Sequence, residues 1–108
     1  MIIKHSETNK KIVGSMKIFE YKINTNFSGS LISTKGKHGT IKCLNEDRIY
    51  FILKGKGKFI IANKEESVKK NDLVFIPKNT PYDIIGKLKY FLICSPEFNS
   101  KDDIFLEN

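Results

Sequence analysis

One arginine has the chemistry and the setting to hold a polar ligand. Arg48 is the sole arginine among 19 basic residues, and Tyr50 follows it at the same-face spacing of a β-strand. A guanidinium group binds a carboxylate or a phosphate through two parallel hydrogen bonds, which a lysine ammonium cannot reproduce. Arg48 is therefore a candidate anchor for an anion. The alternative is a buried structural group that pairs with Asp47, Asp83 or carbonyl oxygens.

Two tyrosines, a histidine and a lysine are the other candidates for chemistry. Tyr50 and Tyr82 can stack on a sugar ring or hydrogen-bond to a hydroxyl group, and either would transfer a proton only if nearby positive charge lowered its pKa from about 10. The candidates for a catalytic acid or base are Tyr82, His38 and Lys42. The alternatives are core packing with satisfied hydroxyl groups for the tyrosines, and a solvated loop position for His38.

Metal ligands are scarce in this sequence. His5 and His38 are the two imidazoles, one in a polar N-terminal stretch and one in a glycine-rich loop, and they form no ligand set. Cys43 and Cys94 have no CxxC spacing, so we expect two reduced, buried thiols and no disulfide. We predict no metal and no other cofactor.

The positive charge of the chain raises the question of a nucleic-acid partner. The formal net charge is +7. Most lysines fall in turns or at alternating strand positions, where protection of sheet edges and solubility explain them without a partner. The sequence contains no GxxxxGK[ST], GxSxG or HExxH motif and no basic helix interleaved with aromatic residues. We therefore expect a small-molecule partner and neither nucleic acid nor a membrane.

Short apolar runs must position these side chains. Residues 48–53 and 58–61 are rich in Ile, Phe and Tyr and flank Lys-Gly-Lys-Gly, which predicts a hairpin with a tight turn. Further turns are expected at residues 24–26 and at Gly86. Other strands are predicted over 15–23, 29–34, 40–44, 67–69, 73–76, 82–85 and 88–94. Many short strands without a convincing helix indicate an all-β antiparallel sandwich or barrel.

The length leaves room for one core, so we expect a single domain over residues 1–108. We divide it into an N-terminal arm or edge strand (1–15), a barrel (16–96) and an acidic tail (97–108). Ile2 and Ile3 are the candidate edge strand, 104–106 a candidate docking segment, and the last residues are expected to be mobile. Without an apolar run of about 18 residues or a secretory signal at its start, the chain is expected in the cytoplasm.

Two spacings carry a family resemblance. The spacing of the first cupin motif is reproduced by Gly36, Lys42, Leu44, Arg48 and Gly55. The spacing of the second is reproduced by Asn71, Pro77, Asn79, Tyr82 and Gly86. The chain thus resembles small single-domain bacterial cupins over residues 36–96. The resemblance implies an antiparallel jelly-roll (cupin) β-barrel and a homodimer.

The resemblance also shows what is missing. Metal-binding cupins have imidazoles and a carboxylate at the positions of Lys42, Leu44, Arg48 and Tyr82. Positively charged side chains repel a cation, so the resemblance implies a metal-independent cupin. At the carboxylate position Arg48 would face the barrel interior together with Tyr50, in a cationic cavity lined by aromatic rings. A register error of one residue would turn Lys42 out to water.

The sequence therefore leads to a metal-independent cupin that binds a small anionic or carbohydrate-like ligand in the barrel. The ligand-binding candidates are Arg48, Tyr50, Tyr82 and Lys42. The resemblance includes sugar isomerases and epimerases, in which an acid and a base move a proton beside a carbonyl group. Whether the chain is an enzyme stays open. The alternatives are a non-catalytic sensor or accessory protein and, as a third class, a basic nucleic-acid-binding protein.

Overall fold

The computed structural model describes residues 1–23 and 25–106, and most of them lie in strands. Asn24, which we expected in a turn, and residues 107–108 of the acidic tail lie outside this range. In chain order the elements are η1 (His5–Glu7), β1 (Asn9–Val13), β2 (Met16–Tyr21), β3 (Ser28–Thr34), β4 (Ile41–Cys43), β5 (Asp47–Ile61), β6 (Lys64–Lys69), β7 (Leu73–Ile76), β8 (Tyr82–Ser95), η2 (Ser100–Asp102) and β9 (Asp103–Phe105).

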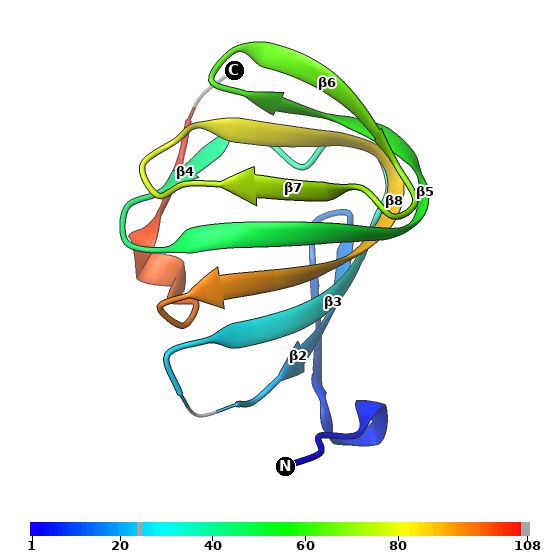
Figure 1. Ribbon diagram of the computed structural model, residues 1–108, viewed down its shortest axis with the longest axis vertical. Coiled ribbons are helices and arrows are strands. Elements are labelled where there is room, and N and C mark those ends of the chain that lie inside the picture. The colour runs from blue at the N-terminus through cyan, green and yellow to red at the C-terminus, as the bar shows by residue number, and fades with distance from the viewer. Residues whose placement is uncertain (24, 107–108) are drawn as a thin grey trace.

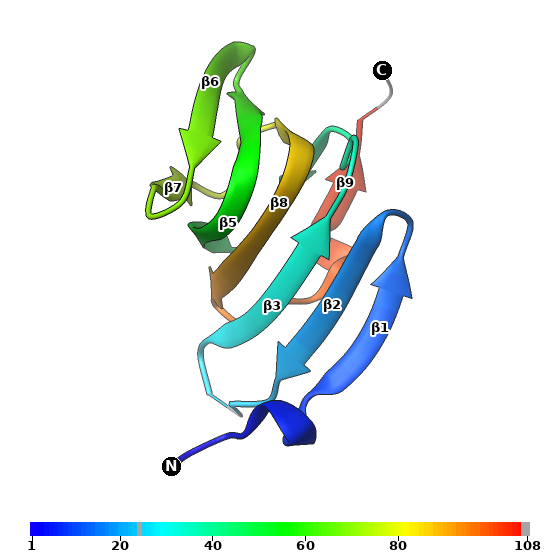
Figure 2. The same cartoon turned by 90° about the vertical axis from the view of Figure 1, so that its right-hand side faces the viewer.

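All the strands belong to one antiparallel sheet that curls into a half-barrel (Figure 1). The strand order is β1-β2-β3-β8-β4-β9, and β5 pairs with β8 while also carrying β6 and β7. Figure 2 shows β1, β2, β3, β8 and β5 side by side along the curl. The all-β antiparallel barrel expected from the sequence is confirmed. No helix in the described part of the chain has the length and apolar character needed to cross a bilayer.

The longest pairing joins β5 and β8, and it corrects the predicted hairpin. β5 continues through Gly55 and Gly57 and stays paired with β8, so the chain bends there and does not reverse. Gly57 lies opposite Gly86 on the neighbouring strand. A Cβ atom added to Gly86 would come within 2.7 Å of the Gly57 Cα atom. Gly55 and Gly86 have φ of +93° and +127°, which favours glycine. These glycines let both strands bend together, so the predicted turn at Gly86 was also wrong.

The true hairpin after β5 lies further along the chain. Ile61 pairs with Lys64 across a two-residue turn, in which Ala62 and Asn63 have φ of +48° and +68°. Positive φ at both central residues is the geometry of a tight turn between twisted antiparallel strands. From the sequence we had placed the hairpin turn earlier, at Gly55 and Gly57.

The two ends of the described chain add strands to the sheet. The N-terminal strand is β1, which pairs with β2, and not the expected Ile2 and Ile3. Within the expected N-terminal arm or edge strand (1–15), residues 9–13 therefore form a strand of the sheet. At the other end, β9 pairs with β4, with Lys42 opposite Ile104. Ser100–Phe105 thus lies against the barrel, and this stretch includes most of the segment that we expected to dock there (104–106).

The core fills the concave side of the curled sheet. It combines branched aliphatic side chains with four aromatic rings: Tyr50, Phe59, Tyr82 and Tyr90. Tyr50 makes edge-to-face contacts with the other three rings at centroid distances of 5.1–5.9 Å. Such contacts are favourable beyond the area they bury. The interior is therefore rich in aromatic rings and carries three tyrosine hydroxyl groups.

Candidate functional site

Arg48 is buried on the inner face of the sheet. On β5 the side chains of Arg48, Tyr50 and Ile52 are all buried, as the period of two predicted. The Arg48 Nε and Nη2 atoms donate to Glu46 Oε1 at 3.0 and 2.9 Å, and Nη2 also donates to Asp103 Oδ1 at 2.6 Å. Nη1 donates to the Tyr82 hydroxyl oxygen at 2.8 Å. Four of the five N–H donors are thus used within the chain.

These contacts correct the expected electrostatics of the interior. Two carboxylates, Glu46 and Asp103, face a single guanidinium group, so the interior is not the cationic cavity that the sequence predicted. The partners are also not those expected, because Asp47 accepts from the Lys78 amide while Asp83 accepts from two other amides. The positions where an anion would meet the guanidinium fork are filled by the chain's own carboxylates.

The two candidate tyrosines form a hydrogen-bonded pair next to Arg48. The hydroxyl groups of Tyr50 and Tyr82 hydrogen-bond to each other, and both side chains are buried. Burial raises the pKa of Tyr82 to about 12 despite the adjacent guanidinium, and burial raises the pKa of Tyr50 as well. These shifts oppose the lowering that a tyrosine base would need. Both hydroxyl groups therefore stay protonated at neutral pH and serve as hydrogen-bond donors.

His38 lies against Tyr82 and is not a solvated loop residue. Its ring stacks on the Tyr82 ring, with centroids 6.0 Å apart and an interplanar angle of 22°. Its segment is fixed by two hydrogen bonds of 2.8 Å, from the His38 amide to the Ile84 carbonyl oxygen and from the Gly39 amide to Asp83. His38 Nδ1 lies 2.8 Å from the Gly39 carbonyl oxygen, which can only accept. In the neutral ring this leaves Nε2 as the atom with a free lone pair.

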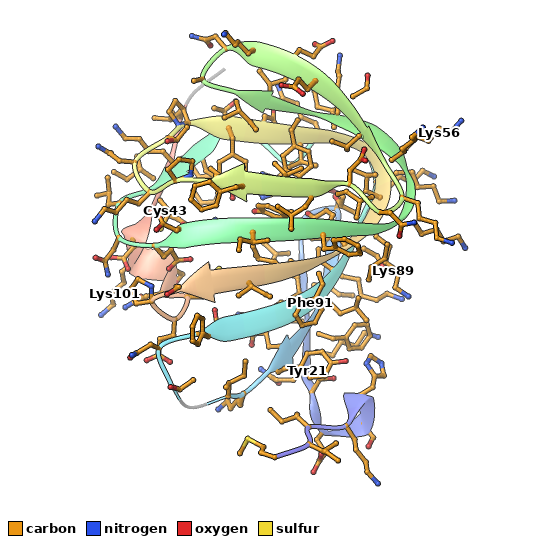
Figure 3. All side chains as sticks on the ribbon, viewed as in Figure 1. Tyr21, Cys43, Lys56, Lys89, Phe91 and Lys101 are labelled. Carbon is orange, nitrogen blue, oxygen red and sulfur yellow. The ribbon has the colours of Figure 1, made fainter. Side chains whose placement is uncertain are left out.

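Lys42 lies outside the interior. On β4 the side chains of Ile41 and Cys43 are buried, and Lys42 between them points the other way. The motif alignment therefore placed Lys42 on the wrong face, because a shift of one residue reverses the side of the sheet. Figure 3 shows Cys43 on the side of the molecule where β4 and β9 meet. Both Cys43 and Cys94 are free and buried, as expected.

The residues of this interior do not suit the divalent ion that the cupin fold commonly holds. Among residues 1–23 and 25–106, no three His, Cys, Asp or Glu side chains converge to form a metal site. At two of the positions where the cupin resemblance implies metal ligands, Arg48 has a guanidinium group and Tyr82 a protonated phenol, and the two are hydrogen-bonded to each other. Such donors repel or ignore a cation. The donor set therefore disagrees with a resident metal.

Three functional candidates were missed by sequence reasoning. Glu46 precedes Arg48 by two residues, so the same-face spacing used for Tyr50 would have found it. Asp103 is 55 residues from Arg48 and carries no local signal. Tyr90 is buried, and its hydroxyl oxygen has no hydrogen-bond partner among the described residues. Its position on the apolar strand β8 gave no reason to single it out.

Comparisons with known sequences do not establish a family. No family model matches the chain. A curated relative, the uncharacterized protein MJ1618 of Methanocaldococcus jannaschii, is 34% identical over 70 residues, which is 61% of this chain and 56% of that protein. The matched part thus spans little more than half of that relative.

Solved structures match over nearly the whole chain. A variant of Streptomyces PAC13 with uridine has a TM-score of 0.92 at 17% identity, covering 99% of this chain and 90% of that one. Pac13 is described as a nucleoside dehydratase. KdgF from Halomonas sp. has a TM-score of 0.83 at 10% identity, covering 94% and 97% of the two chains. Oxalate decarboxylase from Bacillus subtilis has a TM-score of 0.83 at 16% identity and covers 94% and 31%.

These neighbours are cupin-fold proteins, and the chain has the same small cupin-type fold. At such low identity the likeness concerns the fold and carries no activity with it.

Proposed function

We propose that the chain binds a small, uncharged, carbohydrate-like molecule, such as a sugar or a nucleoside, beside His38 and Tyr82. The observation that carries this proposal is the hydrogen-bonded series Arg48, Tyr82 and Tyr50, with the half-buried His38 ring stacked on Tyr82. Aromatic rings and hydroxyl donors are the groups that bind sugars. The anionic ligand expected from the sequence is the weaker alternative, because it would have to displace Asp103 from Arg48.

The hydrogen bonds suggest how Tyr82 would hold a ligand. Its hydroxyl oxygen accepts from Arg48, and it accepts a second time where Tyr50 is the donor. The Tyr82 hydrogen is then available for a ligand oxygen. Such a tyrosine, supported by a guanidinium group and protonated at neutral pH, acts as a donor and not as a base. The solved PAC13 structure with uridine supports a nucleoside as one ligand class to test.

In the catalytic form of the proposal, His38 and Tyr82 divide a proton transfer between them. His38 Nε2 takes a proton from a carbon atom next to a ligand carbonyl group, and Tyr82 hydrogen-bonds to the carbonyl oxygen that gains negative charge. Return of the proton to the opposite face of that carbon gives an epimer, and its return to a neighbouring atom gives an isomer. In the alternative form the chain only binds the ligand, as a sensor or accessory protein would.

A thermal-shift screen with matched variants tests the binding proposal. The probes are nucleosides, neutral sugars and sugar acids. At about 100 times its dissociation constant, a ligand stabilises the folded state by about 2.7 kcal/mol. We expect a neutral sugar or nucleoside to stabilise the wild type, with loss of the shift in His38→Ala and retention in Lys42→Ala. Turnover of that compound then separates the enzyme from the binding protein.

Other outcomes would contradict the proposal. A complete absence of hits, or equal shifts in wild type and His38→Ala, would remove the role of this site. Hits confined to sugar acids would restore the anionic ligand. Stoichiometric iron, manganese or zinc in the purified protein would overturn the metal-independent form. The homodimer and the cytoplasmic location remain parts of the proposal, to be checked by sedimentation and by cell fractionation.

A further inference from the structure

The outer face of the sheet carries a band of lysines that follows the strand register. Lys17 lies opposite Ser33, Ser33 opposite Lys89, and Lys89 opposite Lys54, which makes one row across β2, β3, β8 and β5. A second row crosses β8, β5 and β6 through Lys87, Lys56 and Lys69. All the lysines of the two rows are exposed. We call them the basic band: Lys17, Lys54, Lys56, Lys69, Lys87 and Lys89.

The basic band is not neutralised by the chain. Lys54 faces Lys89, and Lys56 faces both Lys87 and Lys69, so like charges lie directly opposite each other on neighbouring strands. Such pairs destabilise a sheet. Within the described residues, none of the band's lysines takes part in an ion pair. The arrangement thus concentrates positive charge at a cost in stability, and an external polyanion would relieve that cost.

A hollow adjoins the band where the sheet bends. It has a volume of about 550 Å³, and its lining residues include Lys17, Lys54, Lys87 and Lys89 of the band together with Lys35, Ser15, Ser33 and Thr34. No carboxylate lies among its lining residues. Ammonium and hydroxyl groups are the donors that proteins direct at phosphate oxygens.

An apolar row runs beside the basic band on the same outer face. It crosses five strands through Phe19, Leu31, Phe91, Phe51 and Leu73. Phe51 and Leu73 are 38% and 61% exposed. In Figure 3, Lys56 and Lys89 lie on the right of the view and Phe91 and Tyr21 lie below them and nearer the middle, whereas Cys43 and Lys101 lie on the left. Successive same-face residues of a strand lie about 6.6 Å apart, so charge and aromatic rings are close neighbours here.

We infer that this outer face binds single-stranded nucleic acid, with phosphates on the basic band and bases stacked on Phe51 and Phe91. With strands about 4.8 Å apart, the band extends about 19 Å from β2 to β6, enough for several nucleotides. Positive grooves flanked by exposed aromatic rings are how proteins hold single strands without reading their sequence. A duplex fits less well, because its bases are stacked inside and cannot meet the apolar row.

This surface is separate from the proposed ligand site. A register shift between Ile52 and Lys54 reverses the alternation of β5, so Lys54 and Lys56 face outward whereas Arg48 and Tyr50 face the interior. The two proposals can therefore fail independently of each other.

Fluorescence anisotropy with labelled oligo(dT) and oligo(U) of about 12 nucleotides tests the inference. We expect binding whose logarithm falls linearly with the logarithm of the salt concentration, with a slope of about −0.7 for each phosphate neutralised. A triple variant with Lys54→Gln, Lys56→Gln and Lys89→Gln should bind at least about 10-fold more weakly and with a shallower slope. Phe51→Ala should weaken binding about 5-fold or more and leave the slope unchanged, because stacking involves no counterions.

The matched control removes the same charge elsewhere: Lys42→Gln, Lys78→Gln and Lys101→Gln, which should keep most of the affinity. Equal losses in the two triple variants would reduce the effect to net charge and overturn the inference. Duplex binding as tight as single-strand binding would overturn it too. So would a dimer, measured by sedimentation, that Phe51→Ala dissociates, because a second copy would then cover this face. Thermal unfolding of each variant verifies that it is folded.

Discussion

Positively charged side chains have opposite surroundings on the two faces of β5. On the inner face Arg48 is 3% exposed and pairs with two carboxylates and a phenol. On the outer face Lys54 and Lys56 are exposed and lie opposite other lysines. A buried charge is expensive unless it is paired, whereas water and salt weaken repulsion between exposed charges. The inner charge is therefore committed to the structure, and the outer charges are free to bind a partner.

Removing the inner charge should give the largest effect. Arg48→Ala leaves Glu46 and Asp103 close together in the interior without their cation. We expect the free energy of unfolding to fall by about 3–5 kcal/mol, as when one partner of a buried ion pair is removed. Urea denaturation measures the change. Lys42→Ala, on the outward side of β4, is the control and should change stability by less than about 0.5 kcal/mol.

A small loss of stability in Arg48→Ala would contradict the proposed difference between the two faces of β5. If Arg48→Ala cost less than about 1 kcal/mol, the guanidinium would be hydrated and held only weakly by its carboxylates. Arg48 would then be free to bind an anionic ligand, as the sequence first suggested. The size of this one loss of stability thus decides between the structural and the ligand-binding role.

The sequence predicted features that depend on neighbouring residues, and it missed contacts between residues far apart in the chain. The cupin resemblance placed Arg48 in the interior, and the period of a strand then placed Tyr50 and Ile52 on the same face, where all three are buried. The carboxylate of Asp103 reaches Arg48 from a strand 55 residues away, which no local pattern announces. The fold class could be predicted because the two cupin motif spacings together extend over several strands, between residues 36 and 96.

The glycines of β5 show why the hairpin was misread. Gly55 has the positive φ that a tight turn also requires, so its local signal for a turn and for a bend is the same. What distinguishes them is the partner strand: Gly57 meets Gly86 of β8, and the two strands bend as a pair. Lys42 failed for a related reason, since a register shift of one residue exchanges the inner and outer faces.

The second-largest effect is expected at high pH, where ionisation of a tyrosine of the inner face should lower the free energy of unfolding. Burial raises the pKa of Tyr82 to about 12, whereas an unfolded tyrosine titrates near pH 10. Between these pH values the unfolded chain has lost a proton that the folded chain keeps, so stability falls as pH rises. The slope is about 1.4 kcal/mol per pH unit for one such tyrosine. Urea denaturation across this range measures it, with tyrosinate absorbance reporting ionisation.

Tyr82→Phe isolates this contribution, because lysines also titrate in the same range. The variant should lose stability less steeply with pH than the wild type. Identical slopes in the two proteins would mean that Tyr82 titrates in the folded state as it does in the unfolded one. The Tyr82 hydroxyl group would then be solvated in the folded protein and would not be the buried donor that the proposed site requires.

The smallest effect is expected on the outer face, with the opposite sign. Lys56→Glu replaces repulsion from Lys87 and Lys69 with attraction, so the free energy of unfolding should rise by about 0.2–1 kcal/mol. Urea denaturation at low and high salt measures the gain, which should shrink as salt screens it. Lys10→Glu changes the net charge equally, but Lys10 lies opposite Phe19, so no comparable gain is expected. Equal gains would assign the effect to the net charge of +7, whereas a gain confined to Lys56→Glu would show that the basic band itself carries the repulsion.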